Sequence, residues 1–221
     1  MRLRFAGLLA LIAAAGLSDE AAVPVEKEPH HRSVFQNDYL QAFRVTVEPR
    51  QSTLMHAHVH DDGAVRLSVA TVTSETAGKP PGAPETVQPG YVTARDTGEH
   101  PLTHKVSNVG TTVFEVVDVQ VLGRPPGLLA EPIAKPAAEN PSMRIYRYDL
   151  APGASTSTHT HRRPYLLVAA TDVNLLMSSP DGRSMQHPVK AGDMHWVDTE
   201  VTHSLGNRGD AAAVLVEFEL K

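Results

Sequence analysis

The chain has 221 residues, of which 41% are hydrophobic, a length that suits one large domain or two small ones with buried cores. Its 20 Lys and Arg residues are scattered and its formal net charge is -5, so we expect no nucleic-acid partner and no binding to anionic membranes. The absence of cysteine excludes disulfides, thiolate metal sites and cysteine nucleophiles, whereas the 12 histidines offer imidazole as a metal ligand.

The N-terminal stretch MRLRFAGLLALIAAAGLS combines Arg2 and Arg4 with a short apolar run from Phe5 to Leu17. This pattern is typical of a secretory signal peptide, and the run is too short to cross a bilayer comfortably. We assign residues 1–22 to the signal, with cleavage after Ala15 or nearer Ala22; an uncleaved interfacial anchor is the alternative. The prediction is a periplasmic or secreted protein with no transmembrane span after signal cleavage.

Residues 30–122 form the first predicted domain. Apolar and polar residues alternate there, as where Phe43, Val45 and Val47 are separated by Arg44 and Thr46. A period of two is typical of strands with one buried face, and no long helical pattern follows the signal segment.

Residues 123–141 separate this domain from the next. They contain prolines at positions 125, 126, 132, 136 and 141. This density disfavours helix and central strand, so we predict a Pro-rich linker that lies against the neighbouring units.

Residues 142–221 form the second predicted domain and repeat the first. Residues 37–58 align with 140–161 at a constant offset of 103, and residues 103–121 align with 202–220 at an offset of 99. Duplicated short strands, separated by Gly and Pro, predict an all-β fold with two sandwiches or barrels.

The stretch GASTSTHTHRRPY contains His159 and His161, which point to the same face if they lie in a strand. Two imidazoles on one face can share a metal ion, and His203 is the candidate third ligand from a neighbouring strand. The repeat gives the equivalent residues of the first copy, which are His56, His58 and His104.

The spacing from Gly153 to the His159 and His161 pair, with a second segment from Gly192 to His203, resembles the paired motifs of the cupin superfamily. Both motifs occur twice, so the chain resembles a bicupin from about His30 onward. This resemblance implies two tandem cupin-type jelly-roll (double-stranded β-helix) barrels. It also implies a homodimer that pairs through its sheets. It leaves activity open, because the superfamily includes dioxygenases, decarboxylases, isomerases, lyases, storage proteins and sugar binders.

The sequence departs from the family pattern at several positions. Where metal-binding cupins usually have a glutamate, the second copy has Tyr165 and the first has Asp62. We therefore predict a three-histidine site without a carboxylate in the second copy, with Tyr165 as the candidate catalytic residue that donates a proton or hydrogen bond. In the first copy Asp62 joins the candidate ligands, and His60 and His100 are near enough in the sequence to compete with this set. Arg50 replaces the glycine that opens the motif.

Three neutral ligands leave the full charge of a divalent metal ion and open positions for water, oxygen or a bidentate substrate. The resemblance to thiol and diketone dioxygenases suggests iron; zinc fits the residues equally, and manganese, nickel and copper stay open. The predicted function is a metal-binding bicupin that acts as a small-molecule metalloenzyme of dioxygenase or isomerase type. The alternatives are a non-catalytic extracytoplasmic cupin that binds a sugar or organic acid, and a structural or storage protein.

Overall fold

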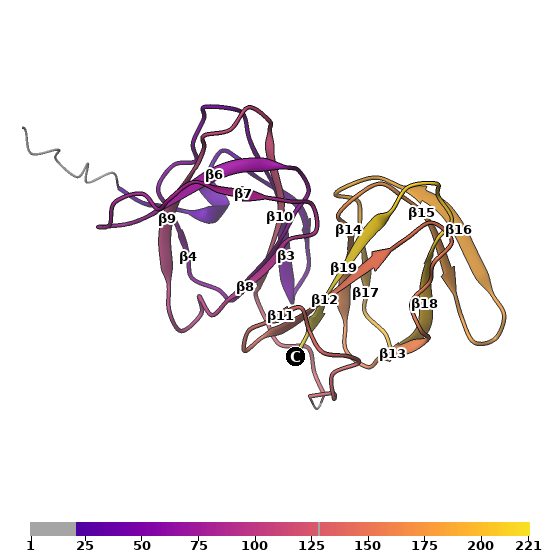
Figure 1. Cartoon of the computed structure of the whole chain (residues 1–221). Helices are drawn as coiled ribbons and strands as arrows, with labels where there is room; N and C mark the ends of the chain where they lie inside the picture. Colours follow the sequence, from indigo (N-terminus) through magenta and orange to yellow (C-terminus); the bar gives the residue numbers. More distant parts are fainter. Residues whose placement is uncertain (1–20, 128) are drawn as a thin grey trace, which may run out of the picture.

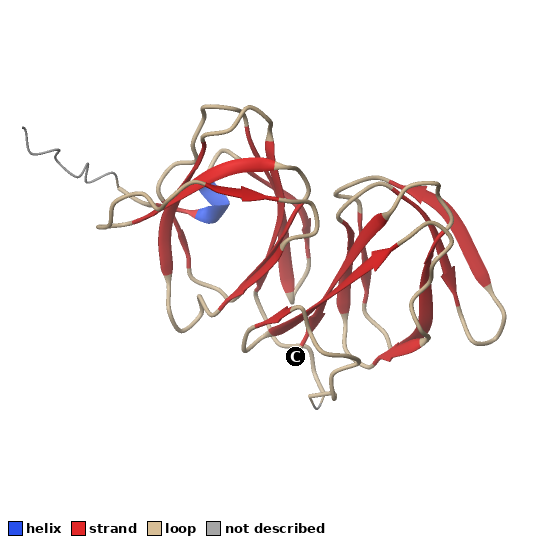
Figure 2. Ribbon diagram, viewed as in Figure 1, coloured by secondary structure: helices blue, strands red, loops and turns tan. Residues whose placement is uncertain are grey.

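The computed structural model describes residues 21–127 and 129–221, so the predicted signal lies outside them except for its last two residues. The described chain forms two barrels that lie side by side and consist almost wholly of strands (Figures 1 and 2). The helix found among these residues is the 3-10 turn η1 (Val25–Lys27), and none of the described segments forms a helix long and apolar enough to span a membrane.

The first barrel consists of two sheets with the strand orders β1-β4-β9-β6-β7 and β2-β3-β10-β5-β8. Its strands are β1 (Val23–Pro24), β2 (His31–Gln36), β3 (Leu40–Val47), β4 (His56–His58), β5 (Asp62–Arg66), β6 (Ala70–Thr76), β7 (Glu85–Val87), β8 (Val92–Arg95), β9 (Leu102–Asn108) and β10 (Phe114–Val121).

The second barrel repeats this arrangement with the strand orders β11-β12-β19-β14-β17 and β13-β18-β15-β16. Its strands are β11 (Ala138–Glu139), β12 (Met143–Leu150), β13 (His159–His161), β14 (Tyr165–Ala169), β15 (Val173–Ser178), β16 (Ser184–Val189), β17 (Met194–Val197), β18 (Val201–Asn207) and β19 (Ala213–Leu220). The duplicated jelly roll predicted from the repeat is confirmed.

One asparagine in each copy fixes the strand that carries the third histidine. The side-chain amide of Asn207, at the end of β18, donates to the carbonyls of Leu150 and Ala211. Asn108, at the end of β9, donates in the same way to Val47 and Thr112. A buried amide that satisfies two carbonyls holds the end of the strand in register.

A hydrophobic cluster joins the two barrels. The sheet with β3 and β10 packs against the sheet with β12 and β19, and the cluster includes Leu40, Val119, Ile145 and Phe218. A Cβ on Gly63 would lie 2.5 Å from Sδ of Met143 and 2.8 Å from Cδ1 of Ile145, so a glycine allows this close approach. Consequently β10 and β19 are buried on both faces.

The Pro-rich segment lies along the second barrel. The guanidinium of Arg163 donates to the carbonyls of Pro125 and Pro126, and that of Arg144 donates to Ala130. These bonds satisfy three backbone carbonyls of a segment whose described residues join a sheet at β11.

Candidate metal centres

The second barrel brings its three predicted histidines together. β13 pairs with β18 so that His159 lies opposite His203, and His161 lies two residues along the same face. The ring centroids of His159 and His203 are 4.6 Å apart, and those of His161 and His203 are 5.5 Å apart. The antiparallel pairing of β13 with β18 thus brings the three imidazole rings into one cluster.

Glu217 of β19 is a fourth member of this cluster, and its potential ligand atom lies within 4.8 Å of those of the three histidines. One of its carboxylate oxygens, Oε2, is 3.0 Å from Nε2 of His161 and 3.8 Å from Nε2 of His159; Oε1 is 3.4 Å from Nε2 of His203. The sequence predicted a site without a carboxylate, whereas the structure places the carboxylate of Glu217 among the three histidines. The carboxylate comes from β19, not from the strand that follows the histidine pair.

The donor set fits a metal ion. Nε2 of His159, Nε2 of His203 and Oε1 of Glu217 are buried and lack a hydrogen-bond partner among the described residues. Nδ1 of His159 donates to the carbonyl of Ser157, and Nδ1 of His161 lies 2.7 Å from Glu219. Metal-binding histidines are commonly oriented in this way through the second ring nitrogen. His159, His161 and His203 stay predicted ligands, and Glu217 joins them.

The charges of His161, Glu217 and Glu219 affect one another inside this cluster. Burial opposes the charged imidazolium of His161, but hydrogen bonds to Glu217 and Glu219 outweigh burial and raise its pKa to about 9. Burial also opposes ionisation of Glu217, yet the three histidine rings around its carboxylate hold its pKa well below the usual value. A metal ion bound at Nε2 of His161 would replace that proton, because only neutral imidazole is a ligand.

Tyr165 lies against this cluster, where the sequence places it. Its ring stacks on His161 with a centroid distance of 4.1 Å, and its hydroxyl is buried without a hydrogen-bond partner among the described residues. Burial and the charges of Glu217 and Glu219 raise its pKa above the usual value, so the hydroxyl keeps its proton. Its catalytic role stays a prediction.

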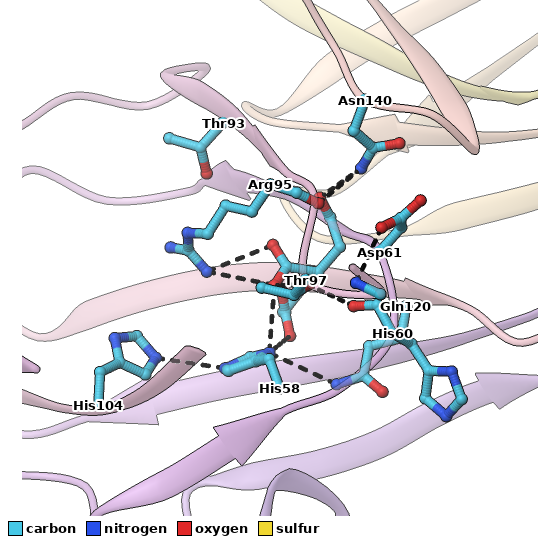
Figure 3. A network of polar contacts seen from close by, with 12 residues as sticks. His58, His60, Asp61, Thr93, Arg95, Thr97, His104, Gln120 and Asn140 are labelled. Atoms are coloured by element: carbon cyan, nitrogen blue, oxygen red, sulfur yellow. Dashed lines mark hydrogen bonds and ion pairs between the residues drawn. The ribbon is translucent and has the colours of Figure 1, made fainter. Parts of the chain in front are cut away.

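The first barrel also gathers its predicted histidines. β4 pairs with β9 so that His56 lies opposite His104, and Nε2 of His104 is 3.2 Å from Nε2 of His58 (Figure 3). Nδ1 of His56 donates to the carbonyl of Leu54, the counterpart of the bond between His159 and Ser157. Nε2 of His56 is buried without a partner among the described residues. Both copies thus orient their first histidine identically.

His31 is a fourth histidine beside this cluster, and it is not among the candidate ligands that the sequence predicts. It is 9% exposed, its ring centroid is 4.7 Å from that of His56, and its Nδ1 lies 2.6 Å from Glu28. His31, His56 and His58 form one potential ligand group. The repeat gave no signal for His31, because β2 is longer than its counterpart β11 and this position has no equivalent.

Asp62 meets the other ring nitrogen of His58. Its carboxylate lies 3.3 Å from Nδ1 of His58 and 3.3 Å from the guanidinium of Arg95. Asp118 is 3.8 Å from the same Nδ1. Burial and the neighbouring Asp118 raise the pKa of Asp62 to about 7. These contacts suit a residue that orients His58, and its place in the ligand set stays a prediction.

Burial keeps His56, His58 and His104 neutral. Burial, opposed by the hydrogen bond to Leu54, lowers the pKa of His56 to about 4. Burial and neighbouring histidines lower the pKa values of His58 and His104 as well. The two other candidate ligands of the first barrel are less buried than these histidines. His60 is half-buried, and the His100 side chain is 74% exposed beside Asp96. Neutral imidazole is the form that binds a metal ion.

No protein-family model matches the chain. The chain is similar to the beta-alanine degradation protein BauB from Pseudomonas aeruginosa, with 32% identity over 83 residues, which are 38% of this chain and 86% of that protein. That match has about the length of one copy.

Two solved structures share the fold over both barrels. A variant of salicylate 1,2-dioxygenase from Pseudoaminobacter salicylatoxidans in complex with gentisate has a TM-score of 0.55 and 14% identity, covering 89% of this chain and 76% of that one. Oxalate decarboxylase from Bacillus subtilis, studied for its Mn(II) centres, has a TM-score of 0.50 and 14% identity, covering 83% of this chain and 69% of that one. The likeness to BauB, the fold shared with these two structures and the duplicated histidine motifs lead to one conclusion: the chain belongs to the cupin superfamily and is a bicupin.

Proposed function

We propose that this bicupin is a small-molecule metalloenzyme of dioxygenase or isomerase type, with a divalent transition metal bound in the second barrel. The observation that supports it best is the convergence of three buried, unpartnered atoms, Nε2 of His159, Nε2 of His203 and Oε1 of Glu217. Leaving such groups buried without partners is costly, and a metal ion would satisfy all of them.

A cavity of about 330 Å³ in the same barrel provides space for a substrate, and its lining includes none of the four potential ligands. Leu167 and Leu215 line it, and they lie two residues from Tyr165 and Glu217 on the same faces of β14 and β19. Leu175, Met177 and Met185 complete an apolar wall. The second barrel therefore favours a substrate with an apolar body.

A bound divalent ion would supply Lewis-acid or oxygen-activating chemistry here. The protein groups have separate tasks. The hydroxyl of Tyr148 donates to Oε2 of Glu217 at 2.7 Å and fixes that carboxylate. Burial and the charge of Glu217 raise the pKa of Tyr148, so this hydroxyl stays a donor. Tyr165 holds a proton at the wall of the site, where a reacting oxygen atom would meet it.

The test is metal analysis of untagged protein by mass spectrometry, for wild type and for His159→Ala/His203→Ala, with manganese and iron offered first in reconstitution. His187→Ala, an exposed histidine of β16, is the matched control. We expect the double variant to lose one metal ion per chain and the control to keep it. Oxygen-consumption and isomerase screens with apolar carbonyl compounds then follow. Metal content unchanged by the double variant contradicts the proposal, and metal without turnover favours a ligand-binding cupin.

We also propose an extracytoplasmic location, supported by the basic and apolar pattern of residues 1–22. Cell fractionation with mass determination of the mature N-terminus tests it. Full-length protein in the cytoplasmic fraction would contradict it.

A further inference from the structure

The first barrel contains a second cavity, of about 370 Å³, that reaches the histidine cluster. Arg66, Arg95 and His104 line this cavity, and the same three residues line the small space around the histidines. Glu85 and Tyr91 on its rim are exposed, so the cavity is accessible from solvent.

Arg66 lies in this wall, and none of the carboxylates in the described part of the chain forms an ion pair with it. Its guanidinium carbon lies 5.7 Å from the ring centroid of Tyr91 and 6.0 Å from that of Phe114. Its side-chain hydrogen bond is a long one of 3.4 Å to Thr93, and its buried Nε has no partner among the described residues. A buried guanidinium donor is costly to leave unpaired.

Arg95 adds a second positive charge to the same wall. It is engaged with Asp62 on one side, and its side chain is 29% exposed. Burial lowers the pKa of Arg66 to about 10 against the opposing charges of Asp118 and Asp62, and repulsion between the guanidinium groups of Arg66 and Arg95 adds to the lowering. An anion between them would relieve that repulsion.

The second barrel lacks both arginines. Ala169 is the equivalent of Arg66 in the second copy, because Arg66 pairs with Val116 in the same way as Ala169 pairs with Leu215. Val197 is the equivalent of Arg95, because Arg95 pairs with Asp62 in the same way as Val197 pairs with Tyr165. The fold therefore does not require the two arginines, because the second barrel forms with apolar residues at both positions.

We propose that the first-barrel cavity binds a small organic carboxylate, with its carboxylate group on Arg66 and Arg95 and its apolar body against the valines of the wall. Those valines are Val72, Val87 and Val106. This goes beyond the proposed function, because it concerns the first barrel and needs no metal ion in the second. A guanidinium fork matches the planar carboxylate, while the apolar wall favours an organic ion over an inorganic one.

The experiment measures butyrate binding by calorimetry and by the shift in melting temperature, with butyramide as the neutral isostere and inorganic phosphate at equal ionic strength. Arg66→Met removes the charge at similar length, and Arg183→Met removes an exposed arginine as the matched control. We expect butyrate to bind wild type and the control, and to bind Arg66→Met at least about 10-fold more weakly. Butyramide and phosphate should give no shift that depends on Arg66.

Two further variants keep the test decisive. If Arg66→Met does not fold, Arg66→Lys keeps the charge but loses the fork, and butyrate should bind it more weakly than wild type. His203→Ala should lose the second-barrel metal and keep butyrate binding, which separates this proposal from the proposed function. Equal butyrate binding by wild type and the folded Arg66 variants would overturn the proposal. Loss of butyrate binding in His203→Ala would also overturn it, as would a response to phosphate equal to the response to butyrate.

Discussion

Asp118 and Glu217 occupy equivalent positions in β10 and β19, yet only Glu217 reaches all three motif histidines of its own barrel. Glu217 lies 3.0 to 3.8 Å from the Nε2 atoms of His159, His161 and His203. The shorter Asp118 lies 3.8 Å from Nδ1 of His58, the nitrogen that points away from the cluster. One methylene group thus separates a carboxylate that meets three Nε2 atoms from one that forms a potential ligand group with His58 and Asp62.

We predict that Glu217→Asp lowers the metal affinity of the second barrel at least about 10-fold, because the shortened carboxylate no longer reaches the Nε2 atoms. Competition with a fluorescent chelator measures the affinity, in a background with His56→Ala so that the second barrel dominates the titration. Asp118→Asn in the same background is the control and should leave the affinity unchanged. An unchanged affinity in Glu217→Asp would remove Glu217 from the ligand set.

We predict that Glu219→Gln weakens metal binding about 10- to 100-fold, as expected for loss of a charged group behind a ligand. Glu219 accepts from Nδ1 of His161 at 2.7 Å and lies 3.5 Å from Arg144. Gln120 occupies the equivalent position in the first barrel, so the fold accepts glutamine there. The same chelator titration checks the prediction, with circular dichroism to verify folding. Wild-type affinity would mean that Glu219 only neutralises Arg144.

For Tyr165→Phe we predict opposite effects on stability and on activity. The hydroxyl is buried without a described partner, so its removal should leave the free energy of unfolding unchanged or raise it by up to about 1 kcal/mol. Turnover should fall about 100-fold or more if this hydroxyl transfers a proton. Urea unfolding and steady-state kinetics with an identified substrate give the two values. Full turnover would make Tyr165 a packing residue that stacks on His161.

The sequence allowed prediction of the duplication, the strands and the six motif histidines, because a constant offset aligns residues whatever the fold. It could not reveal Glu217. Val216 and Phe218 alternate with Glu217 and Glu219, which reads as one buried and one solvated face. The structure instead buries Val216 and Phe218 between the barrels and turns both glutamates into the barrel.

His31 escaped prediction for a different reason. Internal comparison finds only what both copies share, and His31 belongs to a part of β2 without a counterpart. The pairing of Arg66 and Arg95 around one cavity likewise depends on β5 and β8 lying side by side, which no local spacing encodes.

The contact at Gly63 gives a prediction about the interface between the barrels. A Cβ at this position would lie 2.5 Å from Sδ of Met143, so Gly63→Ala forces the methionine to move and Gly63→Val forces a larger shift. We expect destabilisation of about 1 kcal/mol for alanine and up to about 3 kcal/mol for valine. Urea unfolding measures both. Equal stability of the two variants and wild type would show that the sheets separate without cost.

Arg50 adopts a φ of 68°, and its counterpart Gly153 adopts 78°. The backbone N–H groups of both donate to the asparagine carbonyl that ends the third-histidine strand, Asn108 or Asn207. A left-handed conformation costs a residue with a Cβ about 1 to 2 kcal/mol, whereas glycine adds about 0.4 to 1 kcal/mol of unfolded-state entropy. We therefore predict that Arg50→Gly stabilises the protein by roughly 0.5 to 1 kcal/mol.

Gly153→Ala is the matched reverse change. A Cβ there would meet nothing within 4 Å, so its effect comes from the backbone alone, and we expect it to destabilise by about 1 kcal/mol. Urea unfolding of both variants against wild type measures the pair. Stabilisation by Arg50→Gly with destabilisation by Gly153→Ala would show that the turn before each histidine pair needs the glycine conformation, and that the first copy keeps its turn despite the strain. Destabilisation by Arg50→Gly would instead mean that the arginine side chain stabilises the turn.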